Sequence, residues 1–270
     1  MKLHKYTPAL LTMLVFLLAQ VAGGVLLLIF GMQTDQPPIT AFSLILMAVD
    51  VLAVLACSHI LHYIRTDTVA DFDSIRWWPG SIAIAAGILG AVATSILTEK
   101  VPVPDFLMQI SQSMSHNTCG LFTLVIIGPI AEELLFREAI EGEMLRRNAR
   151  PWTAIIVSSL TFSIIHFNLA QGLYAFPLAI LFGIIYYKTG NIVLTAILHI
   201  INNGSAALQL RTFSNIADIS YAELLGGQAQ AYAITALCAT LSLVLTMYFW
   251  NTYPANKIQQ KKHHFEPNEP

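Results

Sequence analysis

The sequence predicts an all-α membrane protein, a polytopic bundle of about eight transmembrane helices. Of its 270 residues, 56% are hydrophobic and only 11% are charged, whereas charged residues make up about 25% of a typical soluble domain. Apolar runs of about 20 residues, the length that crosses a bilayer as a helix, recur along the whole chain. They lack the alternation of apolar and polar residues that marks a transmembrane β-barrel. A single integral membrane domain is therefore expected over residues 1–250.

Eight apolar runs make up most of this domain. They are Pro8–Met32, Ile39–Ile64, Ser81–Leu97, Leu121–Arg150, Trp152–Phe167, Leu173–Lys188, Ile192–Leu210 and Ala229–Trp250. The first run stays apolar well beyond the roughly 7–15 residues of a signal-peptide core, which predicts an uncleaved span. Pro37 and Pro38 separate it from the second run, because proline ends a helix. The second run carries Asp50 near its middle, and we expect this side chain to face other helices.

The connecting segments are mostly polar. Trp77 and Trp78 precede the third run, where an interfacial aromatic belt is expected. A short amphipathic helix is predicted over Asp105–Met114, and turns are predicted at Asn168–Gly172 and Thr189–Asn191. The tail, residues 251–270, is polar and contains three Pro and a Lys-Lys-His-His cluster, a composition that predicts disorder.

The distribution of positive charge predicts that both termini are cytoplasmic. With the N-terminus inside, eleven of the 14 Lys and Arg residues fall on the inner side, two fall outside and Arg137 lies within a span. An excess of Lys and Arg on the cytoplasmic side is the usual orientation signal of membrane helices. It agrees with an even number of spans.

Net charge and cysteine content exclude several classes of function. The formal net charge of −2 argues against a nucleic-acid partner. The three cysteines, Cys57, Cys119 and Cys238, lie in or beside apolar runs and match neither a disulfide framework nor a zinc motif. We interpret them as small apolar packing residues.

The fourth run is unusual because it carries charges inside the apolar pattern. Glu132, Glu133 and Arg137 each cost roughly 2.5–3.5 kcal/mol at membrane depth on insertion scales, so they need a reason. Glu133 and Arg137 are spaced i,i+4 with Glu first, the favourable order for an ion pair. Glu132 is rotated from Glu133 by about 100° on an α-helix. We predict a structural Glu133–Arg137 pair and a Glu132 that is free for chemistry; a purely structural salt-bridge cluster is the alternative.

Two later spans place polar residues at a similar depth. His166 follows Phe162 by four residues in the fifth run, and His199 and Asn203 lie one helical turn apart in the seventh. At about 1.5 Å per residue, His199 lies roughly 11 Å and Glu132 roughly 12 Å from the cytoplasmic side of the hydrocarbon core. His166 comes out deeper, at roughly 21 Å, unless its helix starts outside the core. We expect four side chains to meet in the cytoplasmic half of the membrane: Glu132, His166, His199 and Asn203.

Together these side chains supply what peptide hydrolysis needs. A carboxylate and an imidazole can activate water, and a second imidazole with a carboxamide can donate hydrogen bonds to a developing oxyanion. No serine elbow, Cys–His pair or HExxH motif occurs in these spans, which argues against a covalent nucleophile and a standard zinc protease. Taken one at a time, each residue also has a packing interpretation, since His and Asn commonly bond neighbouring helices.

Three patterns in this order resemble a known family. Glu132-Glu133-x-x-x-Arg137, Phe162-x-x-x-His166 and His199-x-x-x-Asn203 are similar to the motifs of the CPBP intramembrane proteases. That family includes the CAAX prenyl endopeptidases and the bacterial bacteriocin-processing and self-immunity (Abi) proteins. Other matching positions are Pro129, Phe176-Pro177, Gly183 and Lys188-Thr189-Gly190. The resemblance covers about Leu121–Ser205 and departs from the family at Glu138, where Gly usually follows the Arg.

The resemblance implies a glutamate-dependent peptidase of a bacterial cell membrane, with a protease core over about residues 118–210. In it, Glu132 and His166 activate water. His199 and Asn203 form the oxyanion hole. The remaining motif residues hold the site together: Glu133 and Arg137 as an ion pair, and Phe162 by packing.

The family has also been described as metalloproteases, which raises the question of zinc. Two histidines and a glutamate could hold Zn²⁺ with one open position, here through Glu132, His166 and His199. Asn203 would be an unusual zinc ligand, so we expect no metal and no other cofactor. The expected partners are the lipid bilayer and a peptide or membrane-protein substrate, and nothing in the sequence indicates that the substrate is prenylated.

Two other functions compete with the peptidase. One is a catalytically silent bacteriocin-immunity or membrane scaffold protein, which differs from an enzyme in tolerating substitution of Glu132. The other is a proton-coupled carrier that uses Glu132 and the two histidines as a relay. A carrier is expected to contain repeated broken helices in two halves, and the sequence shows no internal repeat.

Overall fold

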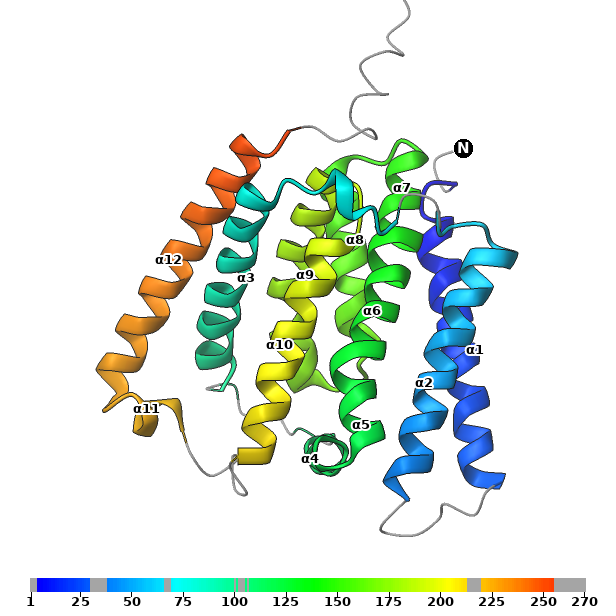
Figure 1. Cartoon of the computed structure of the whole chain (residues 1–270), viewed down its shortest axis with the longest axis horizontal. Coiled ribbons are helices and arrows are strands. Elements are labelled where there is room, and N and C mark those ends of the chain that lie inside the picture. Colours follow the sequence, from blue (N-terminus) through cyan, green and yellow to red (C-terminus); the bar gives the residue numbers. More distant parts are fainter. Residues whose placement is uncertain are drawn as a thin grey trace, which may run out of the picture.

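The computed structural model describes residues 4–29, 38–65, 69–99, 101, 105, 107–212 and 220–254, and these residues form helices and connecting turns without β-strands (Figure 1). Seven helical segments are long and apolar enough to cross a bilayer: Thr7–Leu26, Ile39–Ile60, Trp77–Thr98, Thr118–Arg146, Leu169–Thr189, Val193–Thr212 and Gln228–Thr252. The chain is therefore an integral membrane protein with an all-α polytopic fold, as the sequence predicted.

The fifth predicted run forms the shortest of the apolar helices. This helix, α8 (Pro151–Ile164), has 14 residues, so at about 1.5 Å per residue it covers roughly 21 Å of a hydrocarbon core that is about 30 Å thick. It starts with Pro151, a residue that suits the first turn because its missing N–H would have no helical partner there. It packs along α9 (Leu169–Thr189). All eight runs are thus helical, and seven reach the length of a full span.

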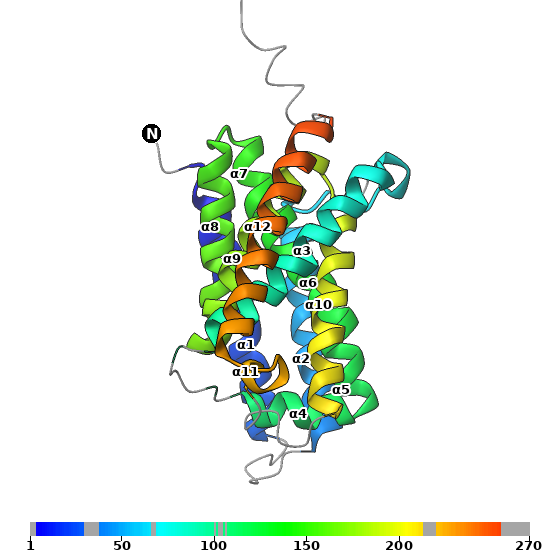
Figure 2. The ribbon, with the colours of Figure 1, turned by 90° about the vertical axis from the view of Figure 1, so that its left-hand side faces the viewer.

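The outer helices form two pairs that flank the centre of the bundle. On one side α1 (Thr7–Ile29) packs against α2 (Ile39–Leu55), which continues through a wider turn, η1 (Ala56–Ile60) (Figure 1). On the other side α3 (Trp77–Thr98) packs against α12 (Gln228–Thr252), and α9 and α10 (Val193–Thr212) lie between the pairs. The start of α1 and the end of α12 lie at the same end of the bundle (Figures 1 and 2).

Short elements close the ends of the bundle. The predicted amphipathic helix is present as α4 (Met108–His116), and with α11 (Tyr221–Leu224) it lies at the end opposite the start of α1 (Figure 1). A single turn, η2 (Phe72–Ser74), precedes α3. The predicted tail starts later than expected, because α12 continues to Thr252; residues 255–270 and the turn before Pro38 lie outside the described residues.

The fourth run is one continuous helix built from five segments. These are α5 (Thr118–Phe122), η3 (Thr123–Ile127), α6 (Gly128–Glu132), η4 (Glu133–Gly142) and α7 (Glu143–Arg146). The side chain of Asn117 caps its start by accepting a hydrogen bond from the Gly120 N–H at 3.0 Å. η3 and η4 are π-helical, with bonds between residues five apart, so the α-helical geometry expected from Glu133 onward was wrong, whereas Glu132 itself lies in the α-helical segment α6. Such widened turns are frequent at functional sites.

The sixth run begins earlier than the sequence predicted. Asn168 caps α9 by accepting a hydrogen bond from the Ala170 N–H at 3.2 Å, so residues 169–172 are helical and the predicted turn over Asn168–Gly172 was wrong. The turn at Thr189–Asn191 is present. It depends on Gly190, whose φ of 75° lies in the left-handed region that favours glycine.

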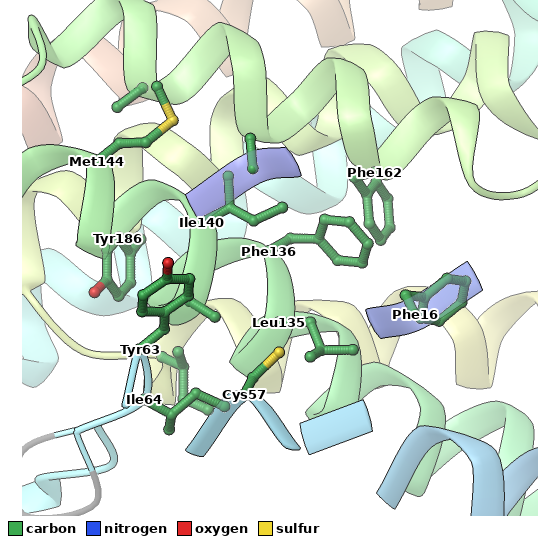
Figure 3. Packing of buried hydrophobic residues seen from close by; sticks show 14 of the residues in the cluster. Phe16, Cys57, Tyr63, Ile64, Leu135, Phe136, Ile140, Met144, Phe162 and Tyr186 are labelled. Atoms are coloured by element: carbon green, nitrogen blue, oxygen red, sulfur yellow. The ribbon is translucent and has the colours of Figure 1, made fainter. Parts of the chain in front are cut away.

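Most buried apolar side chains gather around η4. One cluster joins α1, α2, η4, α8 and α9, and Figure 3 shows Phe136 and Leu135 of η4 between Phe16 of α1, Cys57 and Phe162 of α8. A second cluster joins α3, α9, α10 and α12. Most of the stretch that carries the charged motif therefore lies within the larger of the two buried clusters. This packing fixes its side chains.

Cysteine labelling tests the orientation of the bundle. Asn148 and Ser113 are exposed and lie at opposite ends, after α7 and on α4. In a chain whose three native cysteines are replaced, we expect Ser113→Cys to react with a membrane-impermeant maleimide on intact cells. Asn148→Cys is expected to react only after permeabilisation, because the positive charges that favour the inside cluster near it. Labelling of both positions from the same side would contradict the predicted topology.

Candidate active site

His199 lies at the centre of the charged motif. It is 5% exposed, and α10 carries it against α6 and the start of η4. Its Nδ1 is 2.9 Å from Glu133 Oε1, and its Nε2 is 3.4 Å from Glu132 Oε2. One imidazole ring thus lies between the two adjacent carboxylates. Besides its predicted partner Arg137, Glu133 therefore also binds this histidine, a contact that the sequence did not indicate.

These contacts constrain the protons on His199. A carboxylate oxygen only accepts hydrogen bonds when it is ionised, so Glu133 selects the tautomer with a proton on Nδ1. Without a proton on Nε2, the lone pair of this nitrogen would point at the negatively charged Glu132 carboxylate, and the two groups would repel each other. Attraction between them requires a proton on Nε2. With both nitrogens protonated, His199 is a cation between the Glu132 and Glu133 carboxylates, and its Nε2–H is a donor that lies beside Glu132.

Arg137 connects the site to the core of the bundle. Its side chain is fully buried, with Nε 3.4 Å from Glu133 Oε2 and Nη1 3.4 Å from Glu141 Oε2. Nη1 also donates to Ser158 Oγ at 3.1 Å, and this hydroxyl donates to the Phe136 carbonyl at 2.6 Å. One guanidinium therefore contacts the carboxyl groups of two buried glutamates and ties η4 to α8.

His166 approaches the site through Phe162. The Phe162 ring is buried, and its centroid lies 4.9 Å from that of His166 and 5.8 Å from that of His199. The Nδ1 of His166 lies 2.8 Å from the Phe162 carbonyl oxygen, which can only accept, so Nδ1 carries the proton and Nε2 is left as an acceptor. No hydrogen bond or ion pair joins His166 to Glu132 in the described part of the chain.

Asn203 lies one turn beyond His199 on α10. Its Nδ2 donates to the Leu124 carbonyl at 3.0 Å, and its Oδ1 accepts from Asn202 Nδ2 at 3.2 Å. Of the four side chains that we expected to meet, the structure joins Glu132 and His199 directly and His166 through Phe162. Asn203 is fixed beside them by bonds to other residues.

Three further residues near the site did not emerge from the sequence analysis as part of it. Glu141 follows Arg137 by four residues, and Ser158 precedes Phe162 by four, so both lie on the helix faces that carry the motifs. Asp50 of α2 interacts electrostatically with Glu132. Helical spacing could have indicated Glu141 and Ser158, whereas the approach of Asp50 depends on how α2 packs and has no local signal.

Two positions of the wider motif pattern have clear physical roles. Glu138, where the resembling family usually has Gly, is buried and accepts hydrogen bonds from the Tyr186 hydroxyl and from Arg146 Nη1, the latter at 2.7 Å. Arg146 also donates to the Tyr63 carbonyl at 2.7 Å. The side chain of Glu138, larger than the usual glycine, is therefore held by buried hydrogen-bond partners. At Gly183 an added Cβ would come within 2.9 Å of Glu141 Oε2, so the glycine leaves room for the buried carboxylate.

The candidate ligands do not fit a zinc site in this arrangement. A zinc ion would need Glu132, His166 and His199 to converge on one point at about 2.0–2.2 Å. The Nε2 of His199 lies 3.4 Å from Glu132 Oε2, but among the described residues no hydrogen bond or ion pair joins His166 to either of these groups. Over the described ranges, no three His, Cys, Asp or Glu side chains form a group that could hold a metal ion.

Comparison with known proteins identifies the region that contains these residues. Residues 114–205 match the family model described as "Type II CAAX prenyl endopeptidase Rce1-like". The UPF0177 protein YxdF of Lactococcus lactis subsp. lactis (strain IL1403) is 37% identical over 101 residues, which are 35% of this chain and 54% of that protein. The chain thus matches about half the length of this relative. No solved structure matches the chain. The match to the CAAX prenyl endopeptidase family model thus covers the part of this membrane protein that contains Glu132, His166, His199 and Asn203.

Proposed function

We propose that the protein is an intramembrane endopeptidase that hydrolyses a peptide bond near the cytoplasmic face of a bacterial membrane, using water activated by Glu132 and His166. The contact between Glu132 and His199, backed by Glu133, carries this proposal. It puts a carboxylate base and a protonated imidazole side by side within the region that matches the endopeptidase family. A purely structural ion pair between Glu133 and Arg137 does not require Glu132.

The water is held between the Glu132 carboxylate and Nε2 of His166. The ionised Glu132 carboxylate and the Nε2 lone pair of His166 are both acceptors, so both can orient the water and one can take its proton. The water oxygen then attacks the carbonyl carbon of the substrate. Because no covalent enzyme intermediate forms, the reaction consists of one attack by water and one collapse of the tetrahedral intermediate.

The negative charge that develops on the carbonyl oxygen is stabilised by donors on α10. His199 offers Nε2–H, and Asn203 offers the N–H of its amide that does not bond Leu124. Donors that are fixed before the reaction are worth more than mobile ones, because they need no reorganisation. When the carbon–nitrogen bond breaks, the proton taken from water passes to the leaving amine. The products are a carboxylic acid and an amine, and transfer of the acid proton converts them to a carboxylate and an ammonium group.

A cleavage assay with defined peptides tests the proposal. The purified protein in lipid nanodiscs is given quenched fluorescent membrane peptides, including a CAAX-type set with and without a farnesyl thioether, and new termini are identified by mass spectrometry. We expect specific cleavage that requires Glu132. A folded wild-type protein that cleaves no peptide in the set and leaves the membrane peptides of its host unchanged would favour the silent scaffold instead.

Chelation separates the metal-free mechanism from a zinc-dependent one. We expect active protein to contain no stoichiometric zinc and to retain its turnover after treatment with a chelator. Asn203→Asp is expected to lower turnover, because it puts a negative charge against the developing oxyanion. Stoichiometric zinc whose removal stops cleavage and whose return restores it would overturn the metal-free mechanism. So would an Asn203→Asp variant that binds metal more tightly, because carboxylate is the better ligand.

A further inference from the structure

The carbonyl of Leu124 lacks the donor that the π-helical pattern of its own helix would supply. In the π-helical turn η3, bonds join residues five apart, and the Gly128 N–H is given to the Thr123 carbonyl. The next donor along the helix would come from Pro129, five residues after Leu124, but proline has no N–H. The Leu124 carbonyl therefore faces the neighbouring helix unpaired, and Asn203 Nδ2 of α10 donates to it at 3.0 Å.

The other side of the Asn203 amide is bound as well. Its Oδ1 accepts from Asn202 Nδ2 at 3.2 Å, and Asn202 Oδ1 in turn accepts from the Tyr174 hydroxyl of α9. The donors run in one direction, from Tyr174 through Asn202 and Asn203 to Leu124. Because a carbonyl only accepts and the Tyr174 hydroxyl donates its single proton, each amide in the chain has one satisfying orientation.

We propose that Tyr174 and Asn202 are positioning residues that fix the Asn203 amide with its N–H groups, and not its oxygen, available to the reacting carbonyl. This inference rests on the proposed function, in which Asn203 stabilises the oxyanion. The two ends of a carboxamide have nearly the same shape, so rotation by 180° would exchange a donor for an acceptor at the site. On one side of the amide, the hydrogen bonds from Tyr174 through Asn202 oppose this rotation. On the other side, the Leu124 carbonyl opposes it, because this carbonyl can only accept a hydrogen bond.

The surroundings of Tyr174 allow a clean test. Tyr174 and Asn202 border a cavity of about 240 Å³ between α3, α9 and α10, whose lining also includes Ser205. Tyr174→Phe removes only a hydroxyl group at the wall of an existing cavity, so this variant should retain the fold. Ser205 gives a matched control, because its hydroxyl bonds the Ile201 carbonyl of its own helix at 2.8 Å and does not reach Asn203.

We expect Tyr174→Phe and Asn202→Leu to lower kcat by about 10-fold with KM unchanged, which is less than the roughly 10²–10³-fold loss expected for Asn203→Ala. Ser205→Ala should retain wild-type kcat. The readout that separates positioning from packing is a double-mutant cycle. If Tyr174 acts through Asn203, Tyr174→Phe has no further effect in an Asn203→Ala background, because coupled residues are not additive.

Each outcome supports the inference or overturns it. Wild-type kcat in both Tyr174→Phe and Asn202→Leu, with a slow Asn203→Ala, would overturn the positioning role and leave the proposed function intact. Additive losses in the double variants would likewise assign Tyr174 and Asn202 to packing alone. An unchanged turnover in Asn203→Ala would instead overturn the oxyanion role itself, and the positioning role with it. Should one of the two variants fail to fold, the other carries the same test.

Discussion

Replacing Glu132 by Gln is expected to lower turnover by roughly 10²–10⁴-fold, the usual contribution of a general base, while the protein still inserts and folds. The substitution keeps the shape of the side chain and removes its charge. It ends the attraction to His199 at 3.4 Å, but it also removes repulsion from the nearby Asp50, so the two effects on stability oppose each other. Turnover is measured with the fluorescent peptides, and folding by size-exclusion chromatography and thermal unfolding in detergent.

Glu133→Gln is the matched comparison for this variant, because it makes the same chemical change one residue later. It removes the carboxylate that orients His199 Nδ1 at 2.9 Å and one of the two acidic partners of Arg137. We expect both a loss of turnover and a lower unfolding temperature. The decrease in unfolding temperature is limited, because Glu141 remains as a partner of Arg137. A Glu132→Gln variant that cleaves at the wild-type rate would show that Glu132 is not the base.

Arg137→Leu is expected to cause the largest loss of stability, about 3–5 kcal/mol, as is usual when one partner of a buried charge cluster is removed. The Glu133 and Glu141 carboxylates would remain in the core without their shared cation, and Ser158 would lose a donor. Arg211→Leu is a suitable control, because Arg211 is exposed in the last turn of α10, and surface changes usually alter stability by less than about 0.5 kcal/mol. Equal unfolding temperatures for the two variants would contradict the structural role of Arg137.

The fold was largely predictable because a bilayer imposes a simple rule on sequence. Long apolar runs must become helices, so the number and order of the long apolar helices follow from the positions of these runs in the sequence. The errors lie at ends and in hydrogen-bond patterns. Asn168 was assigned to a turn although it caps α9, and the widening of the helix around Glu133 has no clear signature except Pro129. Both depend on which backbone groups find partners, and apolar periodicity does not report this.

The candidate site was predictable in its residue types and less so in its contacts. The i,i+4 spacing of Glu133 and Arg137 is local, and the pair lies within ion-pair distance. The contact of Glu133 with His199 joins residues 66 positions apart, and the bond from Asn203 to Leu124 joins residues 79 apart. Contacts of this kind depend on how α10 packs against the helix that carries Glu132 and Glu133. The estimated depths in the membrane could place the four side chains at one level, but they could not predict which of them are in contact.

The proposed attack by water is tested most directly by cleavage in ¹⁸O-labelled water with hydroxylamine added as a competing nucleophile. If Glu132 and His166 activate water for direct attack, each new C-terminus contains one ¹⁸O atom and no peptide hydroxamate forms. A hydroxamate product that grows with hydroxylamine concentration would reveal a covalent acyl-enzyme and contradict the proposed mechanism.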